Sequence, residues 1–99
     1  MSIESFDETL FHSDLPVLVF FFNEGMPSVQ KISGLLAETE PLWQGRWILV
    51  CINIRIQPML ALNYGVTAAP SLLLFHRGKL LDSASGCRSE KLLKHWIFT

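Results

Sequence analysis

The alternation of apolar and polar positions predicts four strands separated by amphipathic helical segments. Two strands are nearly continuous apolar runs, residues 17–22 and residues 47–54. A third, residues 71–75, leads into a turn around Gly78, and the chain then returns as a strand over residues 79–85. Runs that lack polar alternation are typical of strands buried on both faces of a sheet.

Helical periodicity fills the intervals between these strands. The predicted helices cover about residues 5–12, 27–39, 59–63 and 90–97. Ser5 and Glu8 form a capping box for the first, Pro41 is expected to end the second, and Ser89 is the expected N-cap of the last. Parallel crossovers followed by a hairpin predict an α/β fold, with a mixed central sheet and helices on both faces.

Composition and charge narrow the functional class. Apolar residues make up 49% of the 99 residues and charged residues 17%, with a formal net charge of −1. Such a chain can fill one core, and its scattered charges indicate neither a nucleic-acid surface nor a membrane surface. The acidic N-terminus lacks the features of a signal peptide, and the cysteines, Cys51 and Cys87, form no Cys-x-x-Cys pair. A cytoplasmic location is therefore expected.

The turn after the first strand has the architecture of an active site without its reactive groups. The apolar run breaks at residues 23–25, and a helix then begins with Met26, Pro27, Ser28 and Val29. The free N–H groups of a first helical turn often bind or polarise a ligand. None of these four residues is a strong nucleophile, acid or metal ligand. The three histidines have no metal-ligand spacing, so neither a metal nor a cofactor is expected.

Several short segments are informative when they are taken together: Val17-Leu18-Val19, Gln44-Gly45-Arg46, Asn53-Ile54, Pro58, Tyr64-Gly65-Val66, residues 69–75, Gly78 and Gly86. With the order of elements and their turns, they give the chain a resemblance to the thioredoxin family over about residues 5–97. It implies a single thioredoxin-like domain over residues 1–99, a three-layer α/β/α structure with a mixed central sheet. It also implies that Pro70 is a cis proline beside the site.

The departures from the family pattern concern its chemistry. The Trp-Cys-Gly-Pro-Cys signature of the family falls on residues 25–29, so that Met26 and Val29 occupy the two cysteine positions. The buried acid of the family falls on Phe20, and the lysine that accompanies it falls on Cys51. Thiol–disulfide exchange needs an attacking thiolate and a second thiol that resolves the mixed disulfide. These four degenerate positions therefore indicate that the chain is not a dithiol enzyme, with Phe20 and Cys51 expected to pack as buried neighbours.

The resemblance also implies a peptide-binding groove that does not depend on cysteines. It is formed by Gly25, Met26 and Pro27, by Ala68, Ala69 and Pro70, and by Gly86 and Cys87. In the family, the main chain of the residue before the cis proline pairs with a peptide like an added strand. We therefore expect a redox-inactive domain that binds a protein or peptide partner as an assembly factor or chaperone-like adaptor. Some hydrogenase-maturation accessory proteins are similar domains without the cysteine pair.

Two alternatives stay open at this stage. Cys87 follows Gly86 beside the groove and precedes Arg88 and the last helix, surroundings typical of reactive thiols, so the chain could be a monothiol redox protein. A structural or oligomerising domain with an unused groove, including a homodimer, is the other alternative. Cys51, in the middle of an apolar strand, is expected to be buried and inert.

Overall fold

The computed structural model describes residues 8 and 12–98, and within them a four-stranded sheet lies between two layers of helices. The strands are β1 (Val17–Phe22), β2 (Ile48–Asn53), β3 (Ser71–His76) and β4 (Lys79–Ser85), in the order β2-β1-β3-β4. β1 pairs with β2 in parallel and with β3 antiparallel, and β3 pairs antiparallel with β4. The predicted mixed sheet is confirmed.

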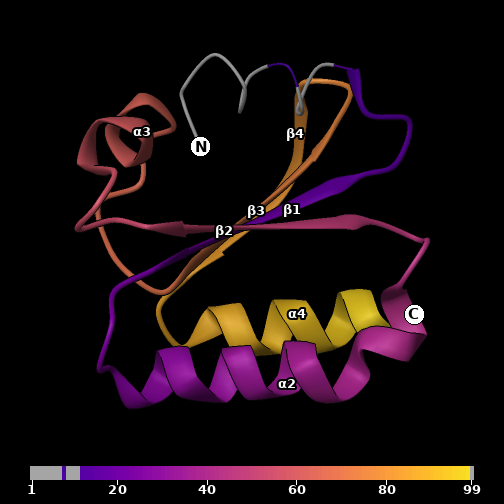
Figure 1. Ribbon diagram of the computed structural model, residues 1–99, viewed down its shortest axis with the longest axis horizontal. Helices are drawn as coiled ribbons and strands as arrows, with labels where there is room; N and C mark the ends of the chain where they lie inside the picture. Colours follow the sequence, from indigo (N-terminus) through magenta and orange to yellow (C-terminus); the bar gives the residue numbers. More distant parts are fainter. Residues whose placement is uncertain (1–7, 9–11, 99) are drawn as a thin grey trace.

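The three helices with described bounds cover the two faces of this sheet. α2 (Pro27–Trp43) and α4 (Arg88–Phe98) lie side by side on one face, and α3 (Pro58–Asn63) lies on the other (Figure 1). The predicted first helix and its capping box at Ser5 lie almost wholly outside the described residues. None of the helices in the described ranges is long and apolar enough to cross a membrane.

The core is divided by the sheet into two apolar clusters. Successive side chains of a strand point to opposite faces, so β1 contributes Val19 and Phe21 to the cluster beneath α3. Its Leu18 and Phe20 belong to the cluster beneath α2 and α4. This explains why the strand shows no polar alternation.

α2 is longer than predicted, because it continues through Pro41 to Trp43. A proline removes one backbone donor and crowds the preceding turn. Here the additional turn buries Trp43, whose indole Nε1 donates to the Leu36 carbonyl oxygen at 3.3 Å. Trp43 also stacks on Trp47, with ring centroids 4.4 Å apart. These contacts offset the cost of the proline and define the end of the helix.

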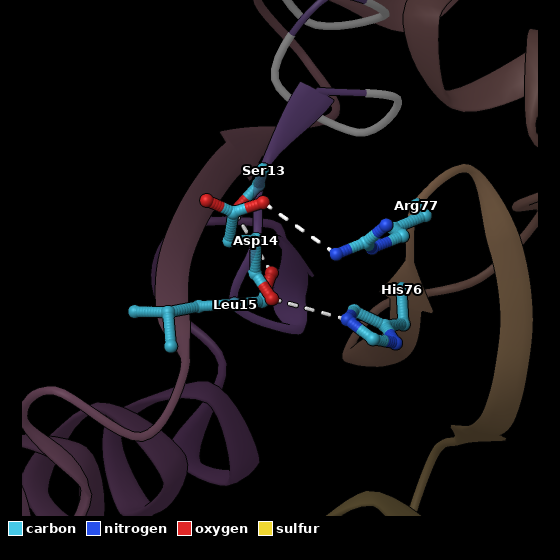
Figure 2. Close-up of polar contacts among 5 residues, drawn as sticks. All are labelled: Ser13, Asp14, Leu15, His76 and Arg77. Carbon is cyan, nitrogen blue, oxygen red and sulfur yellow. Dashed lines mark hydrogen bonds and ion pairs between the residues drawn. The ribbon is translucent and has the colours of Figure 1, made fainter.

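Polar contacts fasten the β3–β4 hairpin to the segment that enters β1 (Figure 2). Arg77 adopts a left-handed φ of 53° and Gly78 follows with 82°, so the turn has two consecutive positive φ values. The guanidinium of Arg77 lies 3.6 Å from the Asp14 carboxylate, and the Nε2 of His76 donates to the Asp14 carbonyl oxygen at 3.1 Å. The predicted hairpin is therefore present, and its turn is bound to Asp14 in the segment before β1.

Candidate functional site

Three loops meet at the end of the sheet where α2 and α4 begin (Figure 1). β1 and β3 are antiparallel, with Phe21 paired to Ser71, so the carboxyl end of β1 lies beside the start of β3. The loop before β3 is joined to the β4–α4 loop by the Gly86 N–H, which donates to the Pro70 carbonyl oxygen at 2.8 Å. The structure therefore brings the predicted groove segments to one end of the sheet.

The α2 segment of the groove presents main chain and apolar side chains. Gly25 turns the chain with a φ of 84°, and Met26 is the extended N-cap residue, without a side-chain capping bond. The Met26 carbonyl oxygen accepts from the Val29 N–H at 3.0 Å, and Pro27 occupies the first turn. Met26 is 36% exposed and Val29 is 6% exposed. One side chain is thus available to a partner, while the other belongs to the core.

The cis-proline loop is held from within by hydroxyl groups. The Ala69–Pro70 peptide bond is cis, as the resemblance implies. The Ser71 hydroxyl donates to the Ala68 carbonyl oxygen at 2.7 Å. Among the described residues, nothing forms a hydrogen bond with the N–H or C=O of half-buried Ala69. The main chain that would pair with a peptide is therefore not engaged by any described residue.

Ser89 supports this loop rather than capping α4. The predicted N-cap lies one residue inside the helix and is completely buried. Its hydroxyl oxygen lies 3.3 Å from the carbonyl oxygen of Pro70 and 3.4 Å from that of Ala84. A hydroxyl has a single proton to donate, so these two acceptors share it. Sequence reasoning missed this role, because a serine at a helix start fits a cap equally well.

The layer beneath the groove corrects one prediction. Phe20 and Cys51 are register neighbours on adjacent strands, and Phe20 is only 2% exposed. Cys51 is exposed rather than buried, because β2 is an edge strand of the described sheet. Its thiol nevertheless lines an apolar hollow of about 230 Å³ together with Phe20 and Leu49. This partial burial raises the pKa of the Cys51 thiol, which disfavours the thiolate.

Cys87 differs from Cys51 in its position. It is exposed and stands between Gly86 and the first residue of α4, within the third of the predicted groove segments. Neither cysteine is in a disulfide. No cluster of three or more histidine, cysteine or acidic side chains suited to a metal occurs in the described part of the chain.

A polar contact that the sequence did not reveal lies next to Gly25, in the turn before α2. The Asn53 side-chain amide donates to the Glu24 carboxylate at 2.9 Å, and its carbonyl oxygen accepts from the Arg55 N–H at 2.9 Å. Asn53 thereby connects the end of β2 to the turn that precedes α2. The two residues are distant in sequence, so no local pattern indicates their pairing.

Comparison with known proteins agrees with this geometry. The thioredoxin family model matches residues 1–99. The chain belongs to the thioredoxin family. A thioredoxin of Rickettsia conorii is 30% identical over 93 residues, covering 94% of this chain and 89% of that protein. A thioredoxin of Rickettsia bellii is 29% identical over 94 residues, covering 95% and 90%.

A probable thioredoxin-2 of Caenorhabditis elegans is 31% identical over 96 residues, covering 97% of this chain and 66% of that protein. Membership of the thioredoxin family accounts for the sheet, the cis proline and the convergence of the three loops. It leaves open the activity of this chain, in which the resemblance implies that Met26 and Val29 occupy the two cysteine positions.

Proposed function

We propose that this thioredoxin-family domain is redox-inactive in the dithiol sense and binds an extended segment of a partner protein in its groove. In this role it acts as an assembly factor or chaperone-like adaptor. The observation that carries the proposal is the unengaged main chain of Ala69, next to Pro70, whose own carbonyl is held by Gly86 and Ser89. A strand-like segment needs only such N–H and C=O groups to pair.

The start of α2 supports the same proposal. Met26 has no ionisable group, and Val29 is buried, so neither could attack or resolve a disulfide. A partly exposed methionine is a soft, adaptable contact for apolar side chains of a bound peptide. A cytoplasmic setting is part of the proposal, since both cysteines are unpaired.

A second candidate is a monothiol redox protein, favoured by the exposure of Cys87 beside Gly86. The two functions differ in their need for a thiol. Turbidity assays of insulin reduction, with dithiothreitol or thioredoxin reductase as reductant, should show no rate above the uncatalysed background. A clear catalysed rate that Cys87→Ser abolishes would replace the adaptor function with the monothiol function.

The groove itself is tested by mapping a partner's footprint. A partner captured from the native host and purified would be titrated into ¹⁵N-labelled protein, and amide shift changes followed. We expect the changes at Gly25–Pro27, Ala68–Pro70 and Gly86–Cys87. A footprint on the opposite face of the sheet would overturn the groove proposal and favour a structural or oligomerising role.

A further inference from the structure

A polar cavity of about 250 Å³ lies directly behind the cis-proline loop. Its floor follows from the register of β3 and β4, where Ser71 pairs with Ser85 and Leu73 with Ser83. Paired residues and their i+2 neighbours share one face of a sheet. Three serine side chains are thereby gathered on the α3 face. Thr67 adds a fourth hydroxyl from the loop.

Arg88 supplies the charge of this cavity, and no described carboxylate lines it. Arg88 is the first residue of α4 and is exposed. Within the described residues its side chain forms no ion pair or hydrogen bond. A guanidinium has five donors in a planar fork that fits a carboxylate. The Ser71 hydroxyl already donates to the Ala68 carbonyl oxygen. The unfilled donors, within the described residues, are therefore Arg88 and the hydroxyls of Thr67, Ser83 and Ser85.

A second hollow continues from Arg88 along α4. It has a volume of about 370 Å³ and lies between the helix and β4, with Arg88 and Lys91 among its lining residues. Asp82 is the carboxylate that faces it, and one of its oxygens accepts the Ser83 N–H at 2.9 Å. The acidic residue of the first α4 turn, Glu90, pairs instead with Lys94 at 3.4 Å. The path from the cis-proline loop along α4 is thus net positive.

We infer that the partner segment bound at Ala69 is acidic, with one carboxylate in the cavity at Arg88 and another at Lys91. The inference rests on the proposed function and names the chemistry of its partner. Three helical residues rise about 4.5 Å. Side chains on one side of an extended segment repeat at about 6.8 Å, a difference that the flexible lysine spans. The expected segment therefore contains two acidic residues separated by one other.

A carboxylate fits this arrangement better than a phosphate does. Recognition of phosphorylated residues commonly uses clusters of arginines, whereas the cavity contains Arg88 alone. Two carboxylates with one negative charge each match two separate cations, Arg88 and Lys91. Charge-assisted hydrogen bonds of this kind are roughly twice as strong as neutral ones.

The test uses two capped peptides, one alternating alanine with glutamate over six residues and the other carrying glutamine in place of glutamate. Each is titrated into ¹⁵N-labelled full-length protein while amide shifts are followed. The glutamate peptide should shift the amides of Ala69, Ser85, Arg88 and Lys91, and should bind at least tenfold more tightly than the glutamine peptide. Its affinity should fall as salt is added, since exposed charges are screened.

Matched variants locate the effect. Arg88→Gln and Lys91→Gln should each weaken the glutamate peptide severalfold and the glutamine peptide hardly at all. Lys31→Gln removes an equal charge from exposed α2 and should change neither affinity. All of these positions are exposed, and thermal unfolding would verify that each variant is folded.

The outcomes separate the inference from the function on which it rests. Equal affinity of the two peptides, with shifts at Ala69, would overturn the acidic preference and leave groove binding intact. Shifts at Arg88 without shifts at Ala69 would overturn the link to the groove and count against the proposed function. If inorganic phosphate moved the Arg88 amide at lower concentration than the glutamate peptide does, the site would be a phosphate site and the carboxylate assignment wrong.

Discussion

α2 and α4 both begin at the predicted groove, but the chemical character of their first residues differs. α2 opens with Met26 and Pro27, has no acidic residue in its first turn and has no side-chain cap. α4 opens with an exposed arginine that follows an exposed cysteine, and its second residue is a buried serine bonded to the cis-proline loop. Of the two helix starts, the described side-chain hydrogen bond to the cis-proline loop comes from α4.

This difference separates two requirements of a thioredoxin fold. A dithiol mechanism needs ionisable groups at the start of α2 and beneath it, where this chain has Met26 and Phe20. Peptide recognition needs a fixed main chain at the cis-proline loop, and here Gly86 and Ser89 hold it. The first requirement can be lost without the second, because they depend on different residues.

The largest expected effect concerns the stability of the core beneath α2. Phe20→Asp should lower the free energy of unfolding by about 4 kcal/mol, because it removes a buried aromatic ring and places a carboxyl among apolar neighbours. Phe98→Asp is the matched control, since Phe98 is 64% exposed and its replacement should cost little. Urea unfolding followed by circular dichroism measures both. A Phe20→Asp variant as stable as the control would show that the cluster beneath α2 is not the tightly packed core described above.

The α4 side is tested by Ser89→Ala. Removing the buried hydroxyl should destabilise the fold by about 1 kcal/mol, since one side-chain hydrogen bond is lost while the Gly86 bond to Pro70 remains. Faster exchange of the Gly86 amide proton should accompany the loss. Ser33→Ala, at an exposed position of α2, controls for helix propensity. Unchanged exchange at Gly86 would mean that Ser89 does not hold the loop.

Met26→Asp sharpens the comparison by separating stability from binding. An aspartate at the N-cap can accept an N–H of the first turn and interacts favourably with the helix dipole, so stability should stay equal or rise by up to about 1 kcal/mol. Partner affinity should nevertheless fall, because a charge replaces the apolar contact. Met59→Asp, on the exposed side of α3, should leave affinity unaltered. Unimpaired binding by Met26→Asp would remove Met26 from the interface.

The fold was largely predictable from the sequence, since its strands are marked by local patterns. Val17–Phe22 and Lys79–Ser85 have the predicted bounds. The end of α2 was not predictable, because the packing of Trp43 against Trp47 overrides the local effect of Pro41. The groove segments followed from the resemblance. The structure then placed Gly86 against Pro70, a contact between residues 16 positions apart that no helical or strand period encodes.

The roles of Ser89 and Cys51 depend on long-range geometry. A serine after a turn reads as a cap, and only the path of α4 beside Pro70 shows that it points inward. A cysteine among apolar residues reads as core, whereas its exposure follows from the place of β2 at an edge of the described sheet. The pattern of apolar residues along the chain does not specify the order of the strands in the sheet.

The smallest expected effect concerns Cys51, an exposed residue whose thiol is partly buried. In a Cys87→Ser background, the rate of alkylation by iodoacetamide reports the thiolate of Cys51 alone. Because burial raises the pKa of this thiol, the midpoint of the rate–pH profile should lie higher in the folded protein than in urea. A folded midpoint at or below that of the unfolded chain would contradict the apolar contact with Phe20 and Leu49.

The raised pKa of the Cys51 thiol also makes the stability of the fold depend on pH. A folded state with the higher thiol pKa keeps its proton while the unfolded chain releases it, so the free energy of unfolding should fall as the pH rises through the ordinary thiol range. At neutral pH the thiol is protonated in both states and contributes nothing. Cys51→Ala should therefore be less sensitive to alkaline pH than the parent protein, as urea unfolding at a series of alkaline pH values would show. An equal sensitivity would mean that ionisation of Cys51 is not coupled to folding.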